Sequence, residues 1–89
     1  MYSLPSGKIP LASHSLLEME LWLGQIGSKR SKGDKSLWLL IRPSWTAKIK
    51  MAEDGLEVIW SKDKEESQIM FCSYGLARND IEEVILHGP

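Results

Sequence analysis

The sequence has one cysteine, no long hydrophobic run, and positive and negative charges that nearly cancel. A single cysteine cannot form an internal disulfide, so nothing in the sequence indicates an oxidising compartment. No apolar run approaches the roughly 20 residues of a membrane-spanning helix. Pro5 and Pro10 interrupt the N-terminal segment, which lacks the basic start and apolar run of a signal peptide. A formal net charge of −1 argues against a protein that works mainly by neutralising phosphates. We therefore expect a cytoplasmic protein that does not contact membranes.

The composition indicates one ordinary globular domain. Hydrophobic residues make up 43% of the 89-residue chain and charged residues 26%, which is typical of folded proteins. A chain of this length forms one core and no more. Prolines and a glycine punctuate the start, so we predict an extended N-terminal arm over residues 1–13 and a single α+β domain over residues 14–89.

One helix is predicted over residues 15–26. Ser15 and Glu18 have the spacing of a capping box, in which each side chain binds the backbone N–H of the other residue. Apolar residues then recur at helical spacing, and Gly27 fits a C-terminal cap. Residues 27–35 contain no apolar side chain and are predicted to be a loop.

Four segments are typical of strands: residues 36–42, 45–51, 56–61 and 68–74. Pairing Arg42 with Trp45 sets the register of the first hairpin, and pairing Met51 with Leu56 sets that of the second. A slip of one residue would turn every side chain to the other face. The two registers agree on one apolar face, which carries Trp38, Leu40, Trp45, Ala47, Ile49, Met51, Leu56, Val58 and Trp60.

The end of the chain is less clearly patterned. Residues 61–66 form a charged stretch that we predict to be a loop. In the strand at 68–74, Ile69 and Phe71 continue the alternation, but Met70 and Cys72 are apolar as well, so the face it presents to the core stays open. A short helix over residues 81–86 is predicted, capped by Asn79 or Asp80 and ended by Gly88 and Pro89.

This order predicts a two-layer α+β fold: a helix, a four-stranded antiparallel meander and a second helix, with both helices on the tryptophan-bearing face. The tryptophans are then core residues and not a platform for stacking nucleic-acid bases. The opposite face of the sheet is left open to solvent.

Three short motifs in this order carry a family resemblance. The first motif is formed by Pro10-Leu11, His14, Leu16, Met19-Glu20, Trp22-Leu23 and Ile26-Gly27. The second is Arg42-Pro43-Ser44-Trp45-Thr46-Ala47, and the third is Arg78-Asn79-Asp80-Ile81-Glu82 with Gly88-Pro89. They resemble a small family of proteins of unknown function from cyanobacteria and plastids. Ser15 and Ala77 depart from it, since the family usually has proline and serine there. The resemblance implies a cyanobacterial cytoplasm or a chloroplast stroma, and it implies no activity.

Two candidate interaction surfaces follow from the pattern. The open sheet face combines apolar and basic residues, as protein-contact surfaces often do; the candidate protein-binding residues are Leu37, Leu39, Ile41, Ile59, Lys48 and Lys50. The loop at 28–35 carries four cations that could contact phosphates; the candidate nucleic-acid-binding residues are Lys29, Arg30, Lys32 and Lys35.

Catalytic and metal sites are not indicated. Cys72 has no histidine near it in sequence to lower its pKa, and His14 and His87 with one cysteine make a poor zinc-ligand set. We expect no enzyme activity and no cofactor. The sequence favours a protein-interaction or assembly module that binds a protein partner. The possibility that the chain forms a homodimer stays open. Weak RNA or ribosome binding through residues 28–35 is the alternative, and an enzyme with an unrecognised site ranks third.

Overall fold

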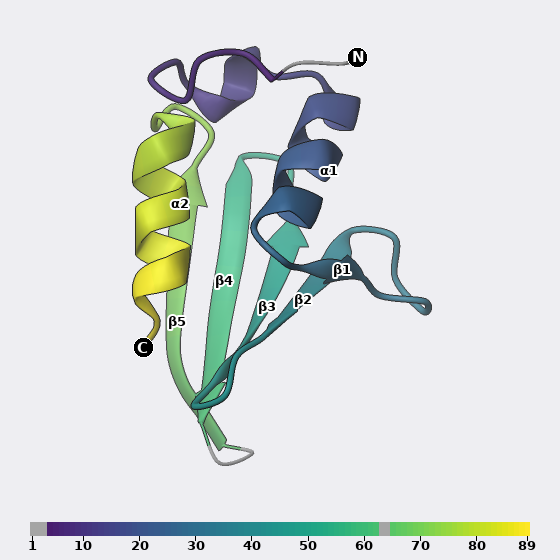
Figure 1. Cartoon of the computed structure of the whole chain (residues 1–89), viewed down its shortest axis with the longest axis vertical. Helices are drawn as coiled ribbons and strands as arrows, with labels where there is room; N and C mark the ends of the chain where they lie inside the picture. The colour runs from purple at the N-terminus through teal and green to yellow at the C-terminus, as the bar shows by residue number, and fades with distance from the viewer. Residues whose placement is uncertain (1–3, 63–64) are drawn as a thin grey trace.

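In the computed structural model, the chain folds into an antiparallel sheet that carries two helices on one of its faces (Figure 1). The structure describes the backbone of residues 4–62 and 65–89, and the side chains of residues 4–62 and 68–89. The sheet has five strands in the order β1-β2-β3-β4-β5. The elements are a 3-10 turn at Leu11–Ser13, α1 at Leu16–Gln25, β1 at Lys29–Arg30, β2 at Leu37–Ile41, β3 at Thr46–Met51, β4 at Gly55–Lys62, β5 at Glu65–Ser73 and α2 at Arg78–His87.

The predicted α+β class and the placement of both helices on one face are confirmed, and the strand count is corrected from four to five. The additional strand is β1, in the segment predicted to be a loop. Lys29 pairs with Leu39 and Arg30 pairs with Trp38. The guanidinium of Arg30 also lies 5.1 Å from the centroid of the Trp38 ring and forms an ion pair with Glu20 of α1. These contacts depend on tertiary structure, so the polar sequence gave no strand signal.

Helix α1 begins as predicted. The Ser15 hydroxyl accepts a hydrogen bond from the backbone N–H of Glu18 at 3.1 Å, and the Glu18 carboxylate accepts one from the N–H of Ser15 at 2.7 Å. The capping box satisfies backbone donors that an uncapped helix start would leave without partners. Gly27 follows the helix with a φ of 101°, a left-handed conformation that glycine adopts without a Cβ clash.

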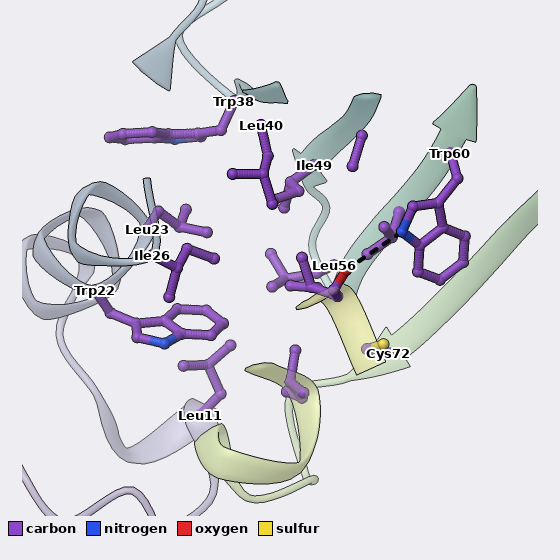
Figure 2. Packing of buried hydrophobic residues seen from close by; sticks show 14 residues of the cluster. Leu11, Trp22, Leu23, Ile26, Trp38, Leu40, Ile49, Leu56, Trp60 and Cys72 are labelled. Atoms are coloured by element: carbon purple, nitrogen blue, oxygen red, sulfur yellow. Dashed lines mark hydrogen bonds between the residues drawn. The ribbon is translucent and has the colours of Figure 1, made fainter. Parts of the chain in front are cut away.

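Both predicted hairpin registers are confirmed. Trp38 pairs with Ile49 across β2 and β3, and Ile49 pairs with Val58 across β3 and β4. Figure 2 shows how side chains of α1 meet the sheet residues in one core. The buried hydrophobic residues are Leu11, Trp22, Leu23, Ile26, Trp38, Leu40, Ala47, Ile49, Leu56, Val58, Trp60, Cys72, Ile81 and Ile85.

The structure decides the face that β5 presents to the helices. Cys72 pairs with Leu56 and is buried, whereas Ile69 and Phe71 point to the opposite face and are exposed. The predicted loop at 61–66 is shorter than expected, because β4 continues to Lys62 and β5 begins at Glu65. Residues 63–64 lie outside the described part of the chain.

Helix α2 starts earlier than predicted and is not capped by Asn79 or Asp80. Its N-cap residue is Ala77, which makes no side-chain cap. The backbone N–H groups of Arg78 and Asn79 instead donate to the carbonyl oxygens of Ile9 and Gly7, at 3.1 and 2.8 Å. The N-terminal segment therefore caps α2 in place of a side chain, a substitution that local sequence does not reveal.

The N-terminal segment also contributes to the core. Leu11 is fully buried, and a β-bridge joins Pro10 to Ala77. The division into an arm at 1–13 and a domain at 14–89 stays a prediction.

Candidate functional site

The sheet face turned away from both helices, here called the open face, contains three rows of side chains that run across the strands. Cross-strand partners share a face, so the register defines each row. The first row is Lys29, Leu39, Lys48, Ile59 and Ile69; the second is Leu37, Lys50, Glu57 and Phe71; the third is Ile41, Thr46 and Ser61.

The apolar residues of the open face are largely accessible to solvent. Relative exposure is 75% for Ile41, 62% for Ile69, 53% for Phe71 and 36% for Leu39. Leu37 and Ile59 are half-buried. Scattered single apolar residues are normal on a protein surface, but here six share one sheet face, and accessible apolar groups of this kind can mark contact sites. They form two groups, one along β2 and one on β4 and β5, with Thr46, Lys48 and Lys50 of β3 between them. The two groups together are here called the apolar patch.

The structure brings the predicted protein-binding residues together and adds three to them. Ile69 and Phe71 extend the apolar patch onto β5, and Lys29 joins it from β1. Lys29 lies in the polar segment predicted to be a loop, and both faces of β5 are apolar in sequence, so neither addition follows from the pattern of the chain. Ser61 pairs with Glu66 but Trp60 pairs with Gln68, so the register shifts by one residue between Trp60 and Ser61. This irregularity turns Ile69 and Phe71 to the open face, whereas an uninterrupted register would have turned them to the core.

The charges on the open face are mostly positive. Lys29, Lys48 and Lys50 are exposed, and Glu57 is the carboxylate directly opposite Lys50. These four side chains together carry a net charge of about +2 at neutral pH, from their ordinary pKa values. Among the described side chains of this face, positive charge thus prevails, on a chain whose formal net charge is −1.

The predicted nucleic-acid-binding residues do not form one surface. Lys29 lies on the open face, whereas Arg30 points to the helix side, where it contacts Glu20 and Trp38. Lys32 and Lys35 are exposed in the connection from β1 to β2. The four cations are therefore divided between two faces and a loop.

Two hollows lie on the helix side. One, of about 420 Å³, lies between the outer flank of α2 and β5, and it is lined by Trp60, Gln68, Met70, Asp80, Glu83, Val84, His87 and Gly88. The other, of about 430 Å³, lies beside the start of α1 and includes Glu20, Arg30 and Tyr74. Among the described residues, no three histidine, cysteine or acidic side chains come together as a possible metal site.

The remaining candidate groups are the two histidines and the cysteine. The ring of His14 is buried, with Nδ1 at 3.2 Å from the Pro10 carbonyl oxygen and Nε2 at 3.1 Å from Nη1 of Arg78. Cys72 is 2% exposed, and its burial raises the pKa of the thiol, which keeps it protonated and unreactive. His87 is exposed at the C-terminal end of α2.

These features define a class: a small two-layer α+β domain whose sheet presents apolar side chains to solvent on the face away from its helices. The chain belongs to the family described as "Protein of unknown function (DUF3143)", whose model matches residues 26–88. The second and third motifs of the sequence analysis lie largely within that range, and most of the first precedes it. No curated protein and no solved structure matches the chain. Over the described residues, neither helix has the length and hydrophobicity that a membrane crossing requires.

Proposed function

We propose that this domain is a protein-interaction module and that its open face is the contact surface. The observation that carries the proposal is the accessible apolar patch on a face that neither helix covers (Figure 1). Ile41, Ile69 and Phe71 remain more than half exposed, although each would gain free energy by burial. A partner that covers the patch would provide that burial.

The charge of the open face specifies the partner further. Lys48 and Lys50 lie between the two apolar groups, and Lys29 and Glu57 lie beside them. A partner that presents apolar side chains next to carboxylates would be complementary in both respects, and the lysines would raise its association rate. A second copy placed face to face would bring the same cations to the contact, which disfavours self-association through this surface.

The test compares four forms of the protein as bait in a lysate of the source organism, before and after nuclease treatment. Leu39→Glu and Ile41→Glu place a carboxylate in the apolar patch, and Gln25→Glu adds the same charge at an exposed polar position on α1, away from the open face. We expect wild type and Gln25→Glu to retain a nuclease-resistant protein partner that the two patch variants lose. All variants should keep the wild-type melting temperature, because surface substitutions cost within about 0.5 kcal/mol.

Two outcomes would count against the proposal. If Leu39→Glu and Ile41→Glu unfolded the chain, the patch would be part of the core and not a contact surface. If the captured material were ribosomal or RNA-bound and disappeared with nuclease, the alternative of weak RNA or ribosome binding would take its place. In that case the lysines and Phe71 of the open face would be the phosphate-contacting and base-stacking groups to test.

A further inference from the structure

The two edges of the sheet differ in how they are protected. At one edge, β1 has only two residues, both charged, which is a common way to prevent unwanted strand pairing. At the other edge, β5 runs for nine residues from Glu65 to Ser73. Its segment from Gln68 to Ser73 contains no charged residue and no proline. An unprotected edge of this kind is a site for the addition of another strand.

The register shows which backbone groups point outward from β5. The N–H of Ala52 donates to the carbonyl of Gly55 at 2.9 Å, so these residues form a hydrogen-bonded pair at the end of the β3–β4 hairpin. Hydrogen-bonded and non-hydrogen-bonded pairs alternate in an antiparallel ladder. Continued through the registers of β3, β4 and β5, this alternation turns the N–H and C=O groups of Met70 toward β4 and those of Ile69 and Phe71 toward the edge.

These outward groups have no protein partner in the described residues. Among the described residues, the backbone of β5 bonds to a residue outside the sheet at its C-terminal end, where the N–H of Leu76 donates to the carbonyl of Ser73. Nor does α2 fill the space above the edge, because the hollow of about 420 Å³ lies between its outer flank and the side chains of Gln68 and Met70. Ile69 and Phe71 therefore present four backbone groups at an accessible edge.

We propose that two copies of this chain pair through β5, antiparallel across a two-fold axis at Met70, and so form a continuous ten-stranded sheet. This register places Ile69 of each copy opposite Phe71 of the other copy. The outward N–H and C=O groups of these residues then bond to one another, and the contact is self-complementary, as a two-fold interface requires. On the open face, the apolar side chains of Ile69 and Phe71 become cross-strand neighbours. No like charges meet within Gln68–Ser73.

The proposal is independent of the proposed function, because pairing through the edge leaves both open faces accessible. It doubles the binding surface, since the two patches become one surface on the same side of the joined sheet. A two-fold axis perpendicular to the sheet also keeps both helix layers on the opposite side. A partner with two matching segments would then gain affinity through avidity.

Sedimentation of the full chain over a wide range of concentrations tests the dimer, with Ile69→Pro and Ile69→Thr as a matched pair. Proline at position 69 removes an outward N–H that makes no hydrogen bond to β4, and edge strands tolerate proline at such positions. Threonine keeps that N–H. We expect a reversible wild-type dimer, whose Kd rises about tenfold or more with Ile69→Pro because the symmetric contact loses two hydrogen bonds. Ile69→Thr should remain closer to wild type.

Cross-linking gives a second measurement if Ile69→Pro fails to fold. In a Cys72→Ala background, Met70→Cys places two thiols at the axis, where Cα atoms of a non-hydrogen-bonded pair lie about 4.5 Å apart, within disulfide range. Gln68→Cys is the control, because its two copies would be offset by four residues, or roughly 13 Å. We expect a disulfide dimer with Met70→Cys and none with Gln68→Cys.

A chain that stays monomeric at every concentration would overturn the proposal, even if it bound an added peptide strand. So would a dimer that cross-links equally at both positions. Ile41→Glu lies outside the edge and should leave the dimer unchanged. A failure of the edge proposal is thereby distinguishable from a failure of the open face to bind a partner.

Discussion

Nη1 of Arg78 lies 3.1 Å from Nε2 of His14 and 3.0 Å from the carbonyl oxygen of Pro5. Because arginine only donates hydrogen bonds, Nε2 of His14 accepts one, and Nδ1 donates to the carbonyl of Pro10. One side chain at the start of α2 thus holds both the N-terminal segment and the residue that precedes α1. His14 of the first motif and Arg78 of the third meet at this contact.

Two further pairs of motif residues also join elements that are distant in the chain. Nε1 of Trp22 donates to Glu82 at 2.7 Å, which joins α1 to α2. Gly88 lies against the Trp45 ring, which joins the second motif to the third. The residues that carry the resemblance therefore tie the two helices, the sheet and the N-terminal segment together. These contacts hold elements that are distant in the chain against one another.

His14→Ala should lower the free energy of unfolding by about 2 kcal/mol, because it removes the buried hydrogen bond from the charged Arg78 guanidinium and the one to the Pro10 carbonyl. Within the described part of the chain, Arg78 then keeps only the Pro5 carbonyl as acceptor for Nη1, and the Pro10 carbonyl keeps only the N–H of Ser13. The same substitution combined with Arg78→Ala should cost less than the sum of the two, with a coupling of about 1 kcal/mol. Urea denaturation of the wild type, both single variants and the double variant measures this coupling. Additive effects would contradict a direct contact.

Glu82→Ala should destabilise the protein by about 2 kcal/mol, since the buried N–H of Trp22 would lose its acceptor. Glu82→Gln keeps an acceptor oxygen and should cost less. The exposed neighbour Glu83 provides the control, and Glu83→Ala should change stability by no more than about 0.5 kcal/mol. Equal losses for Glu82→Ala and Glu83→Ala, measured by denaturant titration, would refute the interhelical bond.

Gly88→Ala should destabilise the protein by about 1–3 kcal/mol. Gly88 has a φ of 84°, and a Cβ there would lie 2.7 Å from Nε1 of Trp45. Gly24→Ala is the matched control, because a Cβ at that helical position meets nothing within 4 Å. It should raise stability by up to about 1 kcal/mol. Thermal unfolding of both variants should show shifts of opposite sign, and shifts of the same sign would contradict the expectation.

Stability should fall at alkaline pH, because burial raises the pKa of both Cys72 and Tyr74. The folded chain favours the neutral forms, whereas the unfolded chain ionises at ordinary values, about 8.5 for a thiol. The contribution of Cys72 is therefore fully present below that pH and is lost as the pH rises through the folded-state pKa. Cys72→Ala should give a flatter dependence of unfolding free energy on pH above about 8.5. An unchanged slope would show that the thiol is not the group responsible.

The sequence by itself determined much of the fold. The Ser15–Glu18 capping box fixed the start of α1, because the groups involved are three residues apart. The alternation in β3, together with two short turns, fixed the registers of β2, β3 and β4. The side chains that face the helices, and most of the candidate protein-binding residues on the open face, follow from those registers. Each of these features depends on local spacing, which a sequence records directly.

Tertiary structure decided the features that depend on residues distant in the chain. Lys29 and Arg30 form a strand because they pair with the edge of β2, and because the Arg30 guanidinium lies over the Trp38 ring. Helix α2 starts at Arg78 because the carbonyl oxygens of Gly7 and Ile9 accept its first N–H groups. In β5 both faces are apolar in sequence, so only pairing with β4 turned Cys72 inward and left Ile69 and Phe71 outside. The residues of the β5 edge and part of the open face are therefore known only from the tertiary structure. An apolar side chain is exposed or buried according to what packs against it, and not according to its own type.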